Sequence, residues 1–332
     1  MVDAEWHRPL TANENFIHSL NEEGCCYISY VLRISSSRVI TEEDGRKVFT
    51  SLYRKSPNLR LCVAERDGEL WFRQMPEEKI DFQVIEGADV NKVFHEITNY
   101  TLNDAEGPMW AARLLPWAPS QASFVESTSC NDEEITKHPN LCHVVMVYRH
   151  DITDGYSCMR IARSILTMFN DLIVGTDIDY TTQIGTLLDV DWERKEKEKI
   201  EQEFLNDPQL LHERKESFAS CTLETLFEKA YPVPPKLKPQ TLSILHIVDK
   251  DQTKKFISRC KEESVTVHTA FCAVVNATII KMLLDAGIDQ PSYTISGLHA
   301  ADCRVYYEGC VDEFGLGMGI LDVTHSVERN ML

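Results

Sequence analysis

The stretch LCHVVMVYRHDITDG, residues 141–155, determines the fold that the sequence predicts. Leu141 to Tyr148 is apolar on both faces, which is typical of a strand in the middle of a sheet. Tyr156 to Leu172 then has the apolar spacing of a helix. The residues from His150 to Gly155 therefore lie at a strand-to-helix junction, where a tight turn holds an imidazole at a fixed position.

His150 is the candidate acid–base group. A histidine at the end of a buried strand removes a proton from a hydroxyl or an amine when a hydrogen bond at its second ring nitrogen fixes the tautomer. Asp154 orients the His150 ring either by contacting it directly or by pairing with a distant cation and so immobilising the turn that carries His150. The second option is favoured, because a buried carboxylate needs a charged partner. Gly155 permits the dihedral or close approach that begins the next helix.

Two other interpretations of this turn stay open. In the first, the turn is a polar loop end and Asp154 only caps the following helix. In the second, the His-Asp pair belongs to a metal-dependent phosphohydrolase. The ligands of such sites converge from helices, whereas the nearby His138 and His143 fall on a loop and a strand. The sequence therefore predicts no metal.

The composition is that of a globular protein. The 332 residues are 43% hydrophobic and 26% charged, enough for one large or two ordinary domains. The net charge of −18 argues against nucleic acid and anionic membranes as partners. The segment Met1 to Arg8 has acidic residues and no apolar core, so it does not resemble a signal peptide.

No stretch is expected to span a membrane, and the longest apolar-rich run, Thr266 to Leu284, is interpreted as a core helix. The eleven cysteines are an odd number without a C-x-x-C pair, which indicates free thiols and a cytosolic protein. Cys142 and Cys272 fall inside apolar patterns, where cysteine usually acts as a small hydrophobe.

Strands and helices alternate in a mixed order, without repeats. Thr41 caps one predicted helix, and Asp67-Gly68 marks a hairpin. The charge-dense residues 191–204 predict a solvated helix, and the proline-rich residues 232–239 predict a linker. The other predicted strands are 25–34, 59–65, 70–75, 110–115, 123–126, 241–248 and 292–298, and the other predicted helices are 42–54, 89–101, 251–263 and 267–286.

Several single residues have a functional and a structural interpretation. His268, at the start of a long predicted helix, is either a second functional imidazole or a polar cap, and the cap is favoured. Trp71, Trp110 and Trp117 are interpreted as core or strand residues, since nothing in their spacing indicates a cofactor site.

The run His150 to Gly155, written H-x-x-x-D-G, resembles the active-site motif of the chloramphenicol acetyltransferase-like superfamily. This superfamily includes alcohol acetyltransferases, plant-type acyl-CoA transferases and peptide-synthetase condensation domains. The resemblance spans essentially the whole chain, and its specific parts are the histidine motif and the segment from Asp302 to Arg304. Weaker matches in the same order are Arg8 to Thr11 with Glu14 and Phe16, Ser56 to Arg60, Ser264 to Ala270, and Phe314-Gly315.

The resemblance implies an α/β fold with mixed sheets, built as a two-subdomain sandwich. It assigns residues 1–185 to an N-terminal subdomain that carries the motif, residues 186–240 to a charged helix and proline-rich crossover, and residues 241–332 to the beginning of a C-terminal subdomain. It further implies His150 as general base, Asp154 as a structural residue and Arg304 as the cation that pairs with Asp154.

The implied activity is transfer of an acyl group from a thioester to an alcohol or amine. Coenzyme A thioester is then a co-substrate, and no permanently bound cofactor is expected. Basic residues that are candidates to meet the coenzyme A phosphates are Lys254, Lys255 and Arg259, although a solvated helix face explains them equally well.

The sequence also departs from the family pattern. Many members have a histidine where this chain has Arg149. The segment Asp312 to Gly317 lacks the tryptophan of the plant-type motif and is interpreted as a glycine step after Arg304. After Leu321 only a short polar tail is expected, so the chain is interpreted either as a truncated product or as a shortened relative, in both cases with an incomplete second subdomain.

Three functions are consistent with these observations. The leading one is a coenzyme A-dependent acyltransferase. The second takes the acyl group from a carrier protein, against which the acidic charge argues mildly, because carrier proteins are usually acidic as well. The third is an inactive member that acts as a binding or regulatory module. The acceptor and the acyl length are not specified by the sequence.

Overall fold

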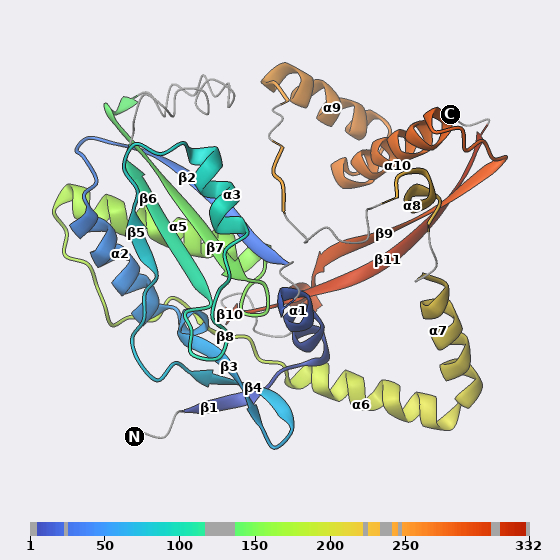
Figure 1. Ribbon diagram of the computed structural model, residues 1–332, viewed down its shortest axis with the longest axis horizontal. Coiled ribbons are helices and arrows are strands. Elements are labelled where there is room, and N and C mark those ends of the chain that lie inside the picture. Colours follow the sequence, from blue (N-terminus) through green and yellow to red (C-terminus); the bar gives the residue numbers. More distant parts are fainter. Residues whose placement is uncertain are drawn as a thin grey trace. The chain divides into compact units, whose positions relative to one another are not determined.

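The structure is a computed structural model that describes residues 5–22, 26–116, 137–221, 225–232, 241–244, 248–306 and 313–329. It divides into two compact units, one with residues 1–192, 239–245 and 302–319, the other with residues 193–238, 246–301 and 320–332. Helices are mixed with several open sheets in the described part of the chain (Figure 1), which confirms the predicted mixed α/β class.

The first unit is built on a four-stranded sheet. Its order is β2 (Tyr27–Ser36), β7 (Asn140–Arg149), β6 (Trp110–Pro116) and β5 (Phe82–Val84). The β7 strand pairs antiparallel with both β2 and β6, and β5 runs parallel to β6. The apolar run at Leu141 is therefore an inner strand, as the sequence predicted.

The side chains of β7 alternate between two apolar cores. Val144, Met146 and Tyr148 point into the core shared with α2 (Glu42–Lys55) and α5 (Gly155–Val174). Val145 and Val147 point into the core shared with α3 (Val90–Thr98). Figure 1 shows α2 and α5 on one face of the sheet and α3 on the other. This double burial fixes the strand that leads into the His150 turn.

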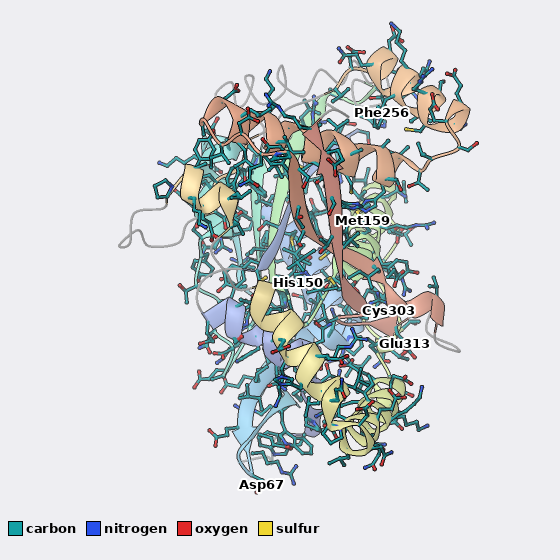
Figure 2. The ribbon with its side chains drawn as sticks, turned by 90° about the vertical axis from the view of Figure 1, so that its right-hand side faces the viewer. Asp67, His150, Met159, Phe256, Cys303 and Glu313 are labelled. Carbon is teal, nitrogen blue, oxygen red and sulfur yellow. The ribbon has the colours of Figure 1, made fainter. Side chains whose placement is uncertain are left out.

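Local sequence signals explain the elements around this sheet. Thr41 forms a capping box with Asp44 at the start of α2. Asp67 and Gly68 have φ values of 55° and 82° and join β3 (Leu61–Arg66) to β4 (Glu69–Gln74), with Asp67 at the tip of the hairpin (Figure 2). Other elements of this unit are β1 (Trp6–Pro9), α1 (Ala12–Glu22), the 3-10 helices Pro57–Arg60 and Cys303–Tyr306, β8 (Thr186–Leu187) and β10 (Glu313–Phe314).

The second unit contains mostly helices and one two-stranded sheet. A small core of Ile280, Leu283 and Tyr293 joins one of these helices to the sheet. The elements are α6 (Asp191–Asn206), α7 (Pro208–Cys221), α8 (Leu226–Ala230), α9 (Lys250–Glu262), α10 (Val267–Asp285), β9 (Ser292–Asp302) and β11 (Met318–Glu328), of which β9 pairs with β11.

Two sequence predictions about strands were wrong. Residues 241–244 form no strand, because they are exposed and bond only to Asn99, whose side chain donates to and accepts from the Thr241 backbone. The expected polar tail after Leu321 is instead part of β11, since its alternation of apolar and polar residues is that of a half-solvated strand. The predicted strand at 123–126, residues 245–247 and Trp117 lie outside the described residues.

The α10 helix is present as predicted but is not a core helix. Only Ile280 and Leu283 are buried, because the small core described above covers only one part of its surface. By length and composition, α10 alone among the described helices reaches the size of a membrane span, contrary to the sequence expectation. One such helix is weak evidence for a span, since core helices of other proteins have the same composition.

Buried His143 on β7 predicts a loss of stability in acid. Burial first, and the charge of Arg33 second, lower the pKa of His143 from 6.5 to about 4. The unfolded chain therefore binds the proton first, and stability falls as the pH drops from 6.5 towards 4, by about 2–3 kcal/mol at pH 4.5. Urea unfolding of His143→Leu should show a smaller difference between pH 7.5 and 4.5 than the unmodified protein. The exposed His138→Leu variant should keep the full difference, and an equal effect of both would contradict the assignment.

Candidate functional site

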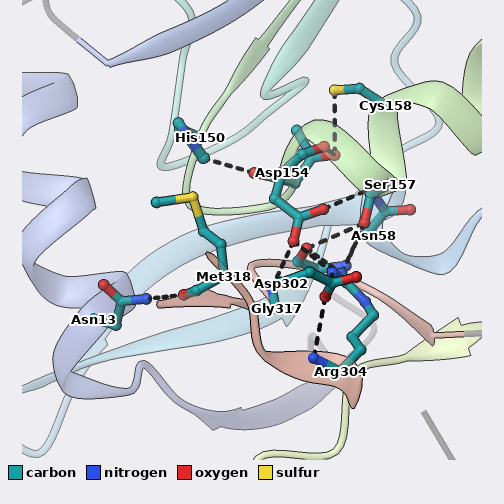
Figure 3. Close-up of polar contacts among 12 residues, drawn as sticks. Asn13, Asn58, His150, Asp154, Ser157, Cys158, Asp302, Arg304, Gly317 and Met318 are labelled. Carbon is teal, nitrogen blue, oxygen red and sulfur yellow. Dashed lines mark hydrogen bonds and ion pairs between the residues drawn. The ribbon is translucent and has the colours of Figure 1, made fainter. Parts of the chain in front are cut away.

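The His150 turn joins the end of β7 to the first residue of α5. Its half-buried imidazole has Nδ1 at 2.8 Å from the backbone carbonyl oxygen of Thr153, so Nδ1 carries the proton and donates it (Figure 3). The other nitrogen, Nε2, is then the unprotonated one. A backbone carbonyl therefore fixes the tautomer, and neither Asp154 nor Asp151 is the orienting group.

Asp154 lies at the other end of this turn and is buried. Its Oδ1 accepts a hydrogen bond from Ser157 N at 2.9 Å, which caps α5. Its Oδ2 accepts from Arg304 Nη1 at 2.6 Å and from Gly317 N at 2.9 Å. The two interpretations of Asp154 from the sequence are thus compatible, since one carboxylate caps the helix and pairs with a cation.

Arg304 lies in the short helix after β9, within the segment that belongs to the first unit. Its Nη2 donates to Ser157 Oγ at 3.1 Å and to Gly315 O at 3.0 Å. The ring of Tyr156 lies 4.9 Å from the guanidinium carbon. Burial lowers the pKa of Arg304, but the hydrogen bond and charge of Asp154 outweigh it and raise this pKa overall. The guanidinium is therefore charged and held in a fixed orientation.

Glycine is required at two positions beside this ion pair. A Cβ atom at Gly317 would collide with the guanidinium carbon of Arg304. Gly315 has a φ of 144°, and its carbonyl accepts from Arg304. Gly155, which the sequence singled out, has neither requirement: its φ is not positive and a Cβ atom there would meet nothing within 4 Å. The expected backbone reason for Gly155 was therefore wrong.

Arg149, the residue before His150, is buried in a second charged network. It bonds to the buried Asp151 (Nη2 to Oδ2, 3.2 Å) and to Glu22 on α1 (Nη1 to Oε1, 2.9 Å). His18 Nδ1, also from α1, lies 2.9 Å from Asp151 Oδ2 and 3.0 Å from Arg149 Nη2. These contacts tie α1 to the residues on both sides of His150.

His18 Nδ1 cannot make hydrogen bonds to both Asp151 and Arg149 at once. It is either the donor to the Asp151 carboxylate or the acceptor from Arg149. The carboxylate already has the guanidinium as its charged partner, and both arrangements keep the three groups in contact. The buried charge of Asp151 is therefore compensated, and the backbone next to His150 is anchored.

The other predicted residues lie elsewhere. Lys254 and Lys255 are exposed on α9, in the second unit, and Arg259 pairs with Glu262 and Glu263 on the same helix.

Trp110 is a core residue, as predicted, and Trp71 is a half-buried strand residue. His268 and Cys272 contact His299 instead of serving only as a cap and a core residue. A cavity of about 190 Å³ in the first unit is lined by Asp151 and Ile152 but not by His150.

Ser157, Gly317, His18 and Glu22 were not predicted as parts of the site, and Gly315 was noted only as a weaker match to the family pattern. The glycines have a visible signal, since they fall in the segment that was interpreted as an ordinary glycine step. His18 and Glu22 had none, because nothing in the sequence connects the first helix to residues more than a hundred positions away.

No family model matches the chain, and no curated protein is similar to it at a significant level. Many solved structures are similar. One is the first condensation domain of the calcium-dependent antibiotic synthetase, with a TM-score of 0.63, 10% identity, and coverage of 98% of this chain and 71% of that one. Another is polyketide synthase associated protein 5 from Mycobacterium tuberculosis, with a TM-score of 0.58, 14% identity, and coverage of 98% of this chain and 69% of that one. A third is a mutant starter condensation domain of rhizomide synthetase RzmA in complex with C8-CoA, with a TM-score of 0.51, 13% identity, and coverage of 97% of this chain and 67% of that one.

The similarity at these identities defines the fold. The chain has the fold of condensation domains, which is the fold that the resemblance of its motifs predicted. It spans about two thirds of the length of the three chains named above.

Truncating Arg149 should destabilise the protein strongly. Arg149→Leu leaves the buried carboxylate of Asp151 without its guanidinium, which costs about 3–5 kcal/mol of unfolding free energy. The double variant Arg149→Leu with Asp151→Leu removes both charges and should recover most of that loss. Urea denaturation of the single and double variants measures the coupling. If the loss of unfolding free energy in the double variant equals the sum of the losses in the two single variants, the two charges do not interact.

Two glycine substitutions distinguish the glycine that the ion pair needs from the one it does not. Gly317→Ala places a methyl group on the Arg304 guanidinium, which is fixed by its hydrogen bonds, and should cost about 3 kcal/mol. Gly155→Ala enters open space at a helical position and should stabilise the chain by about 0.4–1 kcal/mol. Thermal or urea unfolding of both variants measures the difference, and a reversed order would contradict the model of the site.

Proposed function

We propose that this protein is an acyltransferase that moves an acyl group from a thioester to an alcohol or amine, with His150 as the general base. The observation that carries the proposal is the hydrogen bond from His150 Nδ1 to the Thr153 carbonyl, because it leaves Nε2 as a base of fixed direction. The condensation-domain fold supports an acyl-transfer or condensation-type activity in general.

The proposed reaction needs one proton carrier and no covalent enzyme intermediate. His150 Nε2 takes the proton of the acceptor hydroxyl or amine as its oxygen or nitrogen attacks the thioester carbonyl. The tetrahedral intermediate then breaks its carbon–sulfur bond, and the leaving thiolate takes the proton from the His150 imidazolium. The products are an ester or amide and a free thiol, and His150 returns to its neutral form.

Asp154 and Arg304 act in this proposal by position. They pair with each other and do not contact the proposed reacting atoms, but they fix the backbone at the end of the turn whose Thr153 carbonyl orients His150. The presence of Arg149 instead of a histidine does not remove the proposed base, because that base is the next residue, His150. The Arg149 side chain is directed to Asp151 and Glu22.

Coenzyme A thioester is the proposed donor. One of the similar structures is named as a complex with C8-CoA, which supports a soluble thioester as the donor class. Lys254 and Lys255 remain the candidates for contact with the phosphates, and thermal unfolding with added coenzyme A tests for a donor site. Free thiols among the described residues support the proposal of a cytosolic, reducing environment, and they include those of Cys62, Cys142, Cys158, Cys260 and Cys272.

A carrier-protein donor is the second candidate. It is favoured by the condensation domains among the similar structures, since these are domains of a polyketide synthase and of an antibiotic synthetase. The net charge of −18 opposes it. Measuring turnover of one acyl group offered as the coenzyme A thioester and as a carrier-bound thioester decides between the two donors. Failure of both, with no stabilisation by coenzyme A, would favour a binding module.

Replacing His150 tests the proposed base. His150→Ala should lower the rate of thiol release by about 10²–10⁴-fold, the usual contribution of general acid–base catalysis. The melting temperature should change little, because the side chain is only half-buried and the ion pair at Asp154 is retained. The exposed His138→Ala is the matched control and should retain the full rate. Unchanged turnover in His150→Ala would remove this residue from the mechanism.

A further inference from the structure

Three side chains of the second unit converge on one point outside the site described above. His268 and Cys272 lie one turn apart on α10, and His299 lies on β9. His268 Nε2 is 3.0 Å from His299 Nδ1, and Cys272 Sγ is 3.6 Å and 3.8 Å from these two nitrogens. The three atoms therefore form a nearly regular triangle of two imidazole nitrogens and one sulfur.

The size of this triangle fits one face of a zinc coordination tetrahedron. Bond lengths of about 2.0–2.1 Å to nitrogen and 2.3 Å to sulfur at tetrahedral angles give edges of roughly 3.3 Å between nitrogens and 3.6 Å between nitrogen and sulfur. The observed edges differ from these values by only a few tenths of an ångström. Imidazole and thiolate are also the donor types that zinc prefers.

A simple hydrogen bond between the two histidines is the alternative explanation. One ring nitrogen then donates to the other, and the thiol stays protonated. That explanation accounts for the 3.0 Å contact but gives no reason for the sulfur to complete the triangle. The two rings are nearly perpendicular, at 79°, with centroids 5.2 Å apart, so stacking does not hold them together either.

The surroundings leave the cluster accessible. His268 is exposed, and Cys272 and His299 are half-buried. They line a cavity of about 630 Å³, together with Thr269, Asn276 and His325. Gly297, two residues before His299, leaves room for the ring, since a Cβ atom there would lie 3.1 Å from His299 Nε2. A fourth ligand can therefore reach the open side of the triangle from the cavity.

The other cluster with metal-ligand spacing in the described residues, formed by His18, Glu22 and Asp104, is a poorer site. The guanidinium of Arg149 contacts both His18 and Glu22, so a cation there would meet a fixed positive charge. No cationic side chain is among the residues that line the cavity of the α10 cluster.

We propose that His268, Cys272 and His299 bind a zinc ion, with water in the fourth position. On binding, the Cys272 thiol releases its proton to solvent and both imidazoles bind through unprotonated nitrogens, so the affinity falls as the pH is lowered. No metal was predicted from the sequence, because only the histidines around His150 were considered as ligands. This proposal rests on residues of the second unit and is independent of the proposed acyl transfer.

Cobalt substitution of the whole chain tests the site. Titration of the reduced, metal-free protein with Co²⁺ should saturate at one equivalent and give the intense visible bands of tetrahedral cobalt with a sulfur-to-cobalt charge-transfer band. Zn²⁺ should then remove both signals by displacement. Cys272→Ser should abolish the charge-transfer band, and His268→Asn or His299→Asn should weaken Co²⁺ binding by at least ~10-fold.

Two control variants keep the result interpretable. His212→Asn removes an exposed histidine from α7 of the same unit, and Cys303→Ser removes a half-buried thiol, and both should leave the cobalt spectrum unchanged. Gly297→Val keeps all three ligands but displaces the His299 ring, and it should weaken binding while the fold stays intact by circular dichroism. Absence of a charge-transfer band in the unmodified protein, or a band that survives in Cys272→Ser, would overturn the proposal.

Discussion

The ion pair between Asp154 and Arg304 fixes the turn that carries His150, and the geometry of the site depends on it. Both groups are buried, which by itself is costly, since two charges lose their hydration. The arrangement compensates this cost with further bonds. Asp154 accepts from two backbone amides besides the guanidinium, and Arg304 donates to a hydroxyl and a carbonyl besides the carboxylate. Such a pair contributes orientation more than stability, because few other arrangements of the chain satisfy all of these groups at once.

The central strand and the residues of the ion pair could be predicted, and for different physical reasons. Leu141 to Tyr148 is apolar on both faces, and only an inner strand buries both faces of such a run. Arg304 has no local signal that connects it to Asp154, 150 positions earlier. It was assigned through the resemblance to the H-x-x-x-D-G family, and the general argument that a buried carboxylate needs a cation gave the same type of partner. The structure places the two side chains in contact.

The parts of the site that could not be predicted are those made by backbone atoms and by buried polar residues. The hydrogen bond that orients His150 ends on a carbonyl, which every residue has, so no residue type marks it. The α1 helix buries Glu14, His18 and Asn21 as well as Ile17, so its inner face is polar and has no apolar periodicity. Its contribution to the Arg149 network was therefore invisible, although that network anchors the residues next to the proposed base.

The histidines of this chain differ in what holds them, and that difference indicates what each can do. His150 donates one proton to a backbone carbonyl, which leaves one free nitrogen and suits transfer of a single proton. His268 and His299 face each other at 3.0 Å, so at least one of these two nitrogens is unprotonated in a neutral pair. A thiol beside them supplies a third, softer donor. A metal ion can bind all three of these atoms, whereas one shared proton can link only two of them. Each set is complete within its own unit, so loss of the base and loss of the metal ligands are expected to be separable by substitution.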